Sequence, residues 1–334
     1  MNYVGIDLHS NNNYTVIANQ AGQRIFEKRL PNDLGIILAR LEEHAPIASV
    51  AVESTFNYYW LTDGLLDTGY KTLLANPLAM EPYSGLKHQD DKYDAGWMAE
   101  LQRLGILPQS HLYGRKWRGV RDLLRQRSRW VREKIRVLLS LQSRYARCLG
   151  LNLSKYDLLT GSLPELGDPH QQLAAESQIR ILRCLVQEIQ QLEGRVKGQL
   201  LKDDPNYPLL TAVNGIGPVL ASTILLETGD PGRFRRVGRY ASYARVVRSG
   251  RWTNHKKKGQ GNRRCGNQYL GWAYHEAAHC MNRWSPRVQD YRRRQMRKGK
   301  KARVVWSAMA NKICRGFYFV MRDGVTFSPD KLFG

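Results

Sequence analysis

Short apolar runs alternate with helical periodicities along the first hundred residues. Five runs have the length and composition of strands, at residues 3–7, 14–18, 24–29, 49–53 and 71–75. Between them, apolar side chains recur at helical spacing over residues 34–44 and about 58–68. The pattern therefore predicts a mixed α/β sheet in this part of the chain.

The remainder of the chain is mostly helical in pattern. A stretch from Arg115 and a second from about Gln171 to Lys202 each have an apolar face, and a Pro/Gly-rich segment separates them. They predict an antiparallel helical hairpin, which also offers a dimer contact. Pro205 then introduces a last, mostly helical region. We expect three domains, over residues 1–112, 113–203 (a coiled-coil linker) and 204–334.

Four carboxylates follow the apolar elements of the first domain. Asp7 ends the first strand run and Glu53 the fourth, while Asp91 and Asp94 lie one turn apart at the start of a further predicted helix. Clustered carboxylates repel one another unless a cation lies between them. This Asp-Glu-Asp-Asp set suits a pair of divalent cations, Mg²⁺ or Mn²⁺, that act in phosphoryl transfer. Acids at one edge of three strands followed by helix, strand, helix and strand outline a ribonuclease-H-like sheet.

Each of these acids also has a structural interpretation. Carboxylates at strand ends and in the first turn of a helix commonly cap backbone amides. Any one of the four taken alone fits that role. Their joint order, each at the edge of an apolar element, favours the metal site.

Charge separates the first domain from the others. The chain carries 52 Lys and Arg against 29 Asp and Glu, a formal charge of +23. Residues 1–100 hold only 7 of these basic residues and 13 of the acids, so an acidic module precedes a strongly basic one. Nucleic acid is the partner that the basic part favours, and an anionic membrane surface is the lesser alternative.

Neither cysteine spacing nor hydropathy changes this interpretation. The five cysteines show no Cys-x-x-Cys spacing, which argues against a disulfide framework or a cysteine zinc site. No signal-type apolar core and no run of membrane-spanning length occurs, so we expect no membrane partner. The expected location is the cytoplasm of a prokaryote, at the nucleoid when the protein is bound to DNA.

Arginines dominate one face of the first long helix. They recur at intervals of three and four and form one narrow stripe, made of Arg118, Arg121, Arg125, Arg129, Arg132 and Arg136. A charged face is often merely solvated, but solvated faces usually mix signs, and no acid interrupts this stripe. The stripe therefore predicts contact with a nucleic-acid backbone.

Two segments of the last domain have features of phosphate binding. Gly215-Ile216-Gly217 joins two helical stretches in the manner of a helix-hairpin-helix, whose backbone amides can hold a phosphate, although a plain turn fits equally well. A polar loop further on places Ser249 among cations that could hold a scissile phosphate. These cations are Arg245, Arg248 and Arg251. With Lys256, Lys257 and Lys258, which follow in the same loop, they are also predicted to bind nucleic acid.

A protease-like motif lies in the same domain. His275-Glu276-Ala277-Ala278-His279 matches the His-Glu-x-x-His zinc pattern within a predicted helix. That chemistry needs a third protein ligand, and no Glu or His follows His279. We therefore expect both histidines to be packing residues.

Taken together, these motifs resemble the DEDD transposases of the IS-one-ten (IS110) insertion-sequence family, described as bridge-RNA-guided recombinases. The segments that carry the resemblance span nearly the whole chain: Gly5-Ile6-Asp7, Val52-Glu53-Ser54-Thr55, Asp91-Lys92-Tyr93-Asp94-Ala95, Val213 to Gly217, and Ser249 with the Gly-Asn repeats before Tyr269-Leu270. The approach to Ser249 is shorter here than in the commoner family pattern, so Ser242 is the alternative nucleophile.

The resemblance implies a fold, a mechanism and partners. It implies a RuvC-like N-terminal domain whose acids are Asp7, Glu53, Asp91 and Asp94, and a C-terminal transposase domain whose serine, Ser249, forms a covalent phosphoserine link to DNA. It further implies donor and target double-stranded DNA, a structured noncoding bridge RNA, and a homodimer or homotetramer whose protomers share active sites. Two alternatives remain: a RuvC-type nuclease or Holliday-junction resolvase that does not need Ser249, and a nucleic-acid-binding protein without catalysis.

Overall fold

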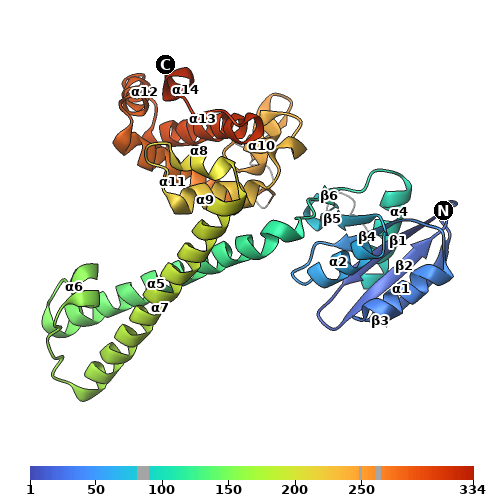
Figure 1. The fold of residues 1–334 in the computed structure, drawn as a ribbon, viewed down its shortest axis with the longest axis horizontal. Coiled ribbons are helices and arrows are strands. Elements are labelled where there is room, and N and C mark those ends of the chain that lie inside the picture. The colour runs from blue at the N-terminus through green and yellow to red at the C-terminus, as the bar shows by residue number, and fades with distance from the viewer. Residues whose placement is uncertain (81–89, 248–249, 260–264) are drawn as a thin grey trace. The chain divides into compact units, whose positions relative to one another are not determined.

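The computed structural model describes residues 1–80, 90–247, 250–259 and 265–334. Its contacts divide the chain into two compact units, Met1–Tyr113 and Gly114–Gly334. The first is a mixed α/β unit and the second is mostly helical (Figure 1). In the part of the chain that is described, no helix combines the length and apolar character needed to cross a membrane.

The first unit is built on a six-stranded sheet in the order β3-β2-β1-β4-β5-β6. Strands β1, β4 and β5 are parallel, and β2, β3 and β6 are antiparallel to their neighbours. All five predicted strands are confirmed. The elements are β1 (Asn2–Leu8), β2 (Asn12–Ala18), β3 (Arg24–Pro31), α1 (Leu34–Glu43), β4 (Ile47–Glu53), α2 (Tyr59–Asp67), β5 (Thr72–Ala75), α3 (Pro77–Met80), α4 (Asp91–Arg103) and β6 (Gln109–Ser110).

Alternation along the strands decides which side chains share a face. Val4, Ile6 and Leu8 of β1 point into the core shared with α1 and α2. The opposite face packs on α4, through a second cluster that includes Ala51 and Met98. Residues of odd number in β1 and β4 therefore face α4.

Gly5 sets the distance between β1 and α4. A Cβ atom built at this position would lie 2.0 Å from the carbonyl oxygen of Ala95 and 2.9 Å from the amide nitrogen of Ala99. Gln102 adds a polar link, because its Nε2 donates to the Val4 oxygen (2.6 Å) and its Oε1 accepts from Ser49 Oγ (2.9 Å). Only glycine allows the helix to approach the strand this closely.

Replacing Gly5 with Ala is expected to lower the free energy of unfolding by about 1–3 kcal/mol, because the added methyl group must push α4 away from the sheet. Chemical denaturation measures the change. Gly119→Ala is the matched control, since Gly119 is helical and a Cβ there meets nothing within 4 Å. In this control, the free energy of unfolding should rise by up to about 1 kcal/mol, because Ala favours the helix more than Gly does. A Gly5→Ala protein as stable as the wild type would contradict the close packing.

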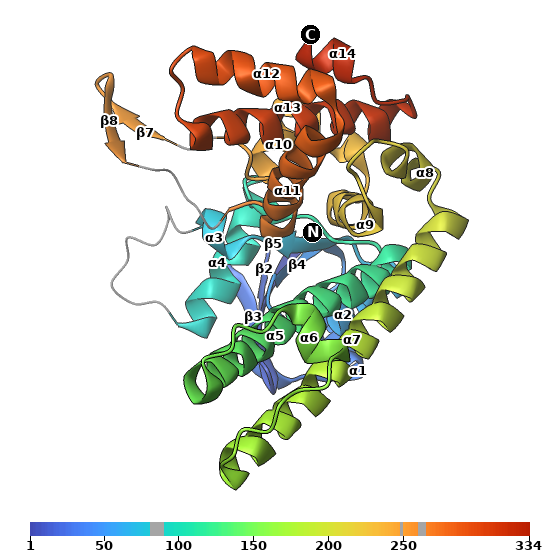
Figure 2. The same ribbon diagram turned by 90° about the vertical axis from the view of Figure 1, so that its left-hand side faces the viewer.

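The second unit begins with a long helical hairpin. Helices α5 (Arg115–Leu149) and α7 (Pro169–Asp203) pack side by side, as Figure 2 also shows. Leu141, Tyr145 and Leu182 are among the residues buried between them. The predicted hairpin is confirmed. Its connection also contains a short helix that the sequence pattern did not predict, α6 (Lys155–Thr160), which starts with a capping box between Ser154 and Asp157.

The rest of the second unit surrounds an aromatic core. Tyr240, Tyr274, Phe317 and Tyr318 are buried, and the hydroxyl groups of Tyr240 and Tyr274 lie 2.6 Å apart. The elements are α8 (Asn206–Thr211), α9 (Pro218–Thr228), the 3-10 turn η2 (Pro231–Arg233), α10 (Val237–Tyr243), β7 (Arg251–Thr253), β8 (Lys256–Gly259), α11 (Gln268–Trp284), α12 (Pro286–Arg297), α13 (Ala302–Asp323) and α14 (Pro329–Phe333).

The sequence predicts a tight turn at Gly215–Gly217 and a polar loop further along this unit. Gly215 has φ 91°, and a Cβ there would lie 2.8 Å from the backbone of Cys280, so the turn between α8 and α9 packs directly on α11. Within the segment expected to be a polar, cation-rich loop, β7 and β8 form an antiparallel hairpin, which projects from the helices in Figure 2. Asn254 and His255 turn this hairpin with positive φ angles of 49° and 56°.

Candidate functional site

The fold brings the four predicted acids of the first unit to one place. Asp7 lies on β1 and Glu53 one residue beyond the register pair Ile6 and Val52, so alternation points both toward α4. Asp91 and Asp94 lie in the first turn of α4, which Asp90 caps by accepting from Tyr93 N at 2.8 Å. Two strand ends and one helix start therefore converge.

His9 lies among these acids and was not singled out from sequence. Its Nε2 atom is 3.3 Å from Asp7 Oδ2 and 3.1 Å from Asp91 Oδ2. Ligand atoms of Asp7, His9 and Asp91 all lie within 4.8 Å of one another. The spacing Asp7-x-His9 was a usable signal, because residues two apart on an extended chain share a face.

Arg29 reaches the same cluster across the sheet. Asp7 pairs in register with Tyr14, and Tyr14 pairs with Arg29, so the three residues form one row across β1, β2 and β3. Arg29 Nη2 donates to Asp91 Oδ2 at 2.6 Å. Burial raises the pKa of Asp91, but the Arg29 hydrogen bond and the charge of His9 outweigh it and hold that pKa below its usual range. Asp91 is therefore an ionised carboxylate.

The pKa values of Glu53 and Asp94 are shifted in the opposite direction, upward. Burial, a hydrogen bond with Asp7 and the charges of Asp7 and Asp94 raise the pKa of Glu53 to about 8. Burial and the charges of Asp7 and Asp91 raise the pKa of Asp94. At neutral pH, Glu53 therefore keeps a proton until a cation replaces it. Carboxylate oxygens of this kind are the donors that a hard divalent cation such as Mg²⁺ or Mn²⁺ prefers.

Glu53 should make stability depend on pH. In the absence of metal, the folded protein binds one more proton than the unfolded chain between about pH 4.5 and pH 8. The free energy of unfolding therefore falls as pH rises through this window, by up to about 1.4 kcal/mol per pH unit. Glu53→Gln should reduce that slope. Urea unfolding in EDTA at pH 5, 6, 7 and 8 measures it.

Glu100→Gln is the matched control for this prediction. Glu100 lies on the same helix, and its pKa is lowered because Arg103 donates to it, against the opposing effect of burial. Its contribution to stability changes only at pH values below this window. Identical slopes in the wild type and in Glu53→Gln would show that Glu53 does not retain a proton.

The arginine stripe of α5 is only partly at the surface. Arg118 and Arg121 are 6% and 7% exposed, and Arg125 forms a two-point ion pair with Glu227, at 2.7 Å for both contacts. This corrects the expectation that the whole stripe meets a nucleic-acid backbone, because the first half of the helix is packed into the core of the second unit. Arg129, Arg132 and Arg136 are exposed, and Arg136 pairs with Glu133.

The ion pair of Arg125 and Glu227 should contribute strongly to folding. Glu227 is 2% exposed and also accepts from Asn267 Nδ2 at 2.7 Å. Glu227→Ala would leave the partly buried guanidinium of Arg125 and the buried amide of Asn267 without their partner, at an expected cost of about 3–5 kcal/mol in the free energy of unfolding. Glu133→Ala removes an exposed ion pair from the same helix and should cost less than about 1 kcal/mol. Equal losses in a denaturation experiment would contradict this account.

The remaining predicted residues belong to α10, to the β7–β8 hairpin and to the chain between them in the sequence. Arg245 has φ 56° and donates from Nε to the Cys265 oxygen at 3.0 Å. Ser242 is exposed on α10, and Lys256 and Lys258 are exposed on β8. Arg248 and Ser249 lie outside the described residues, as do the side chains of Arg251 and Lys257. The proposed roles of these residues stay predictions.

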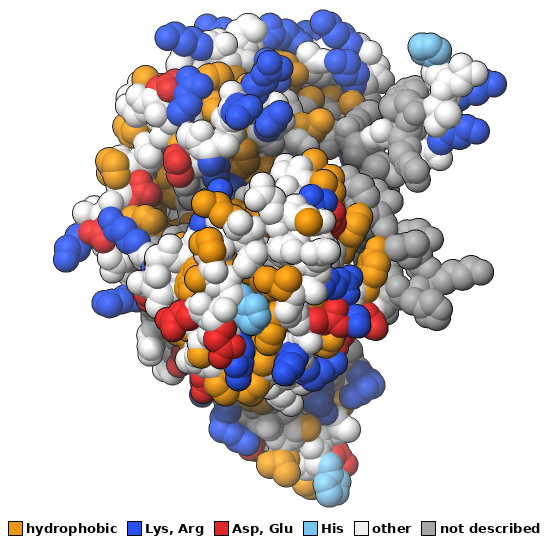
Figure 3. All heavy atoms as spheres, turned by 90° about the vertical axis from the view of Figure 1, so that its right-hand side faces the viewer, with side chains coloured by type: hydrophobic (Ala, Val, Ile, Leu, Met, Phe, Trp, Pro, Cys, Tyr) orange, Lys and Arg blue, Asp and Glu red, His pale blue; other side chains and the backbone are white. Residues whose placement is uncertain are grey.

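Helix α12 carries a basic surface that was not predicted. Its sequence contains Arg287, Arg292, Arg293, Arg294 and Arg297 with Asp290 as the single acid. Arg287 pairs with Asp330 of α14, and Arg292 lies over the Trp306 ring at 5.2 Å. Further Lys and Arg side chains gather at the top of the view in Figure 3. The run Arg292-Arg293-Arg294 was the available sequence signal.

The zinc-protease motif has a packing role. His275 Nδ1 lies 2.7 Å from the Gly271 oxygen one turn earlier on α11, and the His279 ring stacks on Trp306 at 3.8 Å. Among the described residues, His9 with Asp7 and Asp91 forms the only group of three or more potential metal ligands. The expectation that His275 and His279 are packing residues agrees with these contacts.

Comparison with known proteins gives matches in both units. The transposase family DEDD_Tnp_IS110 matches residues 4–144, and the family described as "Transposase IS116/IS110/IS902 family" matches residues 207–293. A protein of Pseudomonas aeruginosa named "Probable family 20 transposase" is 26% identical over 299 residues, which cover 85% of this chain and 87% of that relative. The first match contains all four acids of the cluster.

Proposed function

Since the chain belongs to the IS110 family of transposases, we propose that it cuts and rejoins DNA at the carboxylate cluster of its first unit. The observation that carries this proposal is the convergence of Asp7, Glu53, Asp91 and Asp94 from β1, β4 and α4. A sheet order of β3-β2-β1-β4-β5 with acids on β1 and β4 supports a RuvC-like, ribonuclease-H-type fold.

The four acids would hold Mg²⁺ or Mn²⁺, which supplies charge neutralisation at the scissile phosphate and at the attacking and leaving oxygens. Arg29 and His9 keep Asp91 ionised and oriented before the cation binds. Glu53, whose pKa is raised to about 8, would lose its proton when a cation is bound. The protein residues thus prepare a site whose charge is balanced only by a cation.

Ser249 is the proposed nucleophile. Its Oγ forms a bond to phosphorus while the bond from phosphorus to the departing deoxyribose oxygen breaks. The hydroxyl proton leaves to a base at the site, and the departing oxygen takes up a proton. The resulting phosphoserine ester keeps the phosphodiester energy, so a different strand's hydroxyl can reverse the step without ATP.

The basic residues of the second unit supply nucleic-acid contacts in this proposal. Arg129, Arg132 and Arg136 on α5, the cations of the β7–β8 region and the arginines of α12 suit phosphate backbones and carry little sequence information. Pairing with a structured bridge RNA would supply that information for donor and target DNA. A homodimer or homotetramer would bring the acids of one protomer to the serine of another.

A denaturing gel tests this function. Purified protein is incubated with Mg²⁺, end-labelled DNA of the element's termini and RNA transcribed from its flanks. We expect a labelled DNA band of reduced mobility, because protein is covalently attached to it. Protease treatment should return this band to the mobility of the cleaved DNA. Cleavage without any protein-linked band would favour the RuvC-type nuclease or resolvase instead. Absence of all strand cleavage, with DNA still bound, would favour a binding protein without catalysis.

A further inference from the structure

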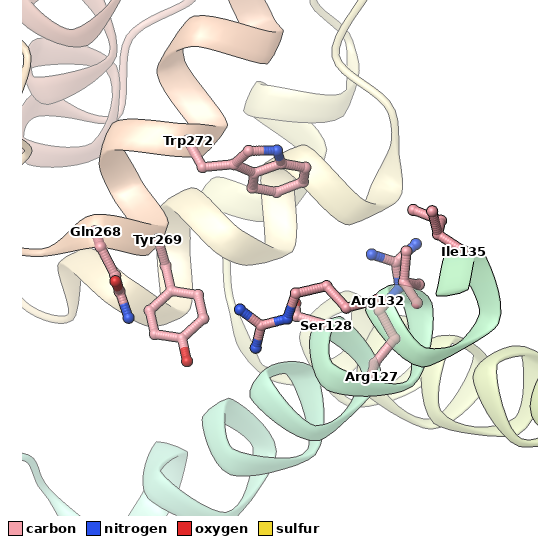
Figure 4. Close-up of a pocket in the computed structure, with 8 residues that line it drawn as sticks. Arg127, Ser128, Arg132, Ile135, Gln268, Tyr269 and Trp272 are labelled. Carbon is pink, nitrogen blue, oxygen red and sulfur yellow. The ribbon is translucent and has the colours of Figure 1, made fainter. Parts of the chain in front are cut away.

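A pocket of about 330 Å³ lies between α5 and α11 within the second unit (Figure 4). Val131 and Ile135 of α5 and the rings of Tyr269 and Trp272 of α11 line it. Tyr269 and Trp272 are three residues apart and so share one face of α11. The volume falls within the range of small-ligand sites, roughly 300–1,000 Å³.

The pocket is apolar and yet open to solvent. Trp272 is 44% exposed and Ile135 is 46% exposed. Large apolar side chains left at the surface beside one another commonly mark a binding site. The mechanism proposed for the carboxylate cluster uses none of these residues.

A buried polar network positions the aromatic wall. Asn267 caps α11 by accepting from the backbone amides of Tyr269 and Leu270, and it donates to Glu227. Glu227 in turn holds Arg125, whose guanidinium lies 4.8 Å from the centre of the Tyr269 ring. These contacts link the first turn of α11 to α5 through Glu227. They hold the aromatic side of the pocket in place before a ligand binds.

Cations surround the opening. Arg127 and Arg132 line the pocket itself, and Arg129 is exposed on the same helix. Arg127 is engaged by Glu193, at 2.6 Å, whereas Arg132 has no ion-pair partner within the described part of the chain. Gln268 lies at the edge and offers both an amide donor and a carbonyl acceptor.

We propose that this pocket receives one unstacked base of a nucleic-acid strand, which stacks on Trp272 while its neighbouring phosphates contact Arg132. The inference rests on the proposed function, since it assigns this surface to a nucleic-acid substrate. Aromatic side chains accept the π face of any base, and arginines neutralise the adjoining phosphates. The same chemistry serves an unpaired nucleotide of DNA or of RNA.

Charge favours this occupant over a second copy of the chain. Two copies meeting through this face would bring Arg129 and Arg132 of one against cations of the other, and like charges at an interface oppose association. A nucleic-acid strand presents an apolar base and an anionic phosphate side by side, which matches the arrangement of Trp272 and Arg132.

The test compares binding of three labelled duplexes in EDTA, measured by fluorescence anisotropy. One carries a single bulged nucleotide, the second an abasic bulge at the same place, and the third is fully paired; each is made as DNA and as RNA. Trp272→Ala should weaken binding of the bulged duplex about 10- to 100-fold and change the other two less than twofold. Trp272→Phe should restore most of the loss.

Trp284→Ala is the matched control, because Trp284 is 69% exposed at the end of the same helix and does not line the pocket. It should bind all ligands as the wild type does. A loss confined to the DNA or to the RNA bulge supports the proposal and names the strand. Equal losses on all three duplexes, no loss on any, or a changed oligomer mass for Trp272→Ala in light scattering would overturn it.

The binding test is independent of catalysis. No divalent metal is present, so a protein unable to cleave DNA still reports on the pocket. Conversely, unchanged nucleic-acid binding by Trp272→Ala would reject the base-binding pocket alone. It would not bear on the proposed cleavage at the carboxylate cluster.

Discussion

Replacing Asp7 with Asn is expected to reduce DNA strand cleavage at least about a thousandfold, which corresponds to about 4 kcal/mol in the activation free energy. Asp7 is 3% exposed and lies 3.3 Å from His9 Nε2, at the centre of the cluster. An amide has the same shape but no charge, and it presents an NH₂ group where a cation would bind. Cleavage rates at saturating Mg²⁺ and Mg²⁺ binding by calorimetry measure the effect.

Glu100→Gln removes one negative charge from the same unit without touching the cluster. Glu100 lies on α4 roughly two turns beyond Asp94 and pairs with Arg103. This control should cleave DNA within about twofold of the wild type, because the substitution leaves the four carboxylates of the cluster in place. Wild-type cleavage by Asp7→Asn, with DNA binding intact, would remove the carboxylate cluster from the mechanism.

Replacing Ser249 with Ala should eliminate the protein-linked DNA band completely, because no other atom of the side chain can form the ester. Binding of DNA and of Mg²⁺ should be unchanged, since the substitution removes one oxygen from a segment rich in cations. Denaturing gels before and after protease digestion measure the covalent product.

Ser242→Ala distinguishes the alternative nucleophile. Ser242 is exposed on α10, seven residues before Ser249 in the sequence. With Ser249 as the nucleophile, Ser242→Ala keeps the linked band. Loss of the band in Ser242→Ala alone would move the assignment to that residue, and undiminished cleavage by both variants would reject a covalent mechanism in favour of hydrolysis.

Local patterns are sufficient to predict most elements of the first unit, the long helical hairpin and the order of the acids. The strands of the first unit and the two helices of the hairpin were predicted because their apolar periodicities are regular and bounded by Gly, Pro or capping residues. The β7–β8 hairpin was missed, because Lys256 and Lys258 form a polar strand without the alternation that identifies a half-buried one.

Contacts between distant segments were not predictable in the same way. His9 and Arg29 join the acid cluster because of the register of β1, β2 and β3, which no single run of residues specifies. Arg125 is indistinguishable by spacing from the other arginines of the stripe, and its pairing with Glu227, 102 residues later, is visible only in the structure.

The sequence by itself determined where the five main strands of the first unit and the two long helices of the hairpin form, and which residues can carry charge or bind a cation, since these properties follow from the side chains and their local spacing. Only the tertiary structure decided which carboxylates meet, which arginines remain at the surface and where Tyr269 and Trp272 face Ile135. Burial and pairing depend on segments that are distant in the chain, and so the same residue type acquires a different role at each place in the fold.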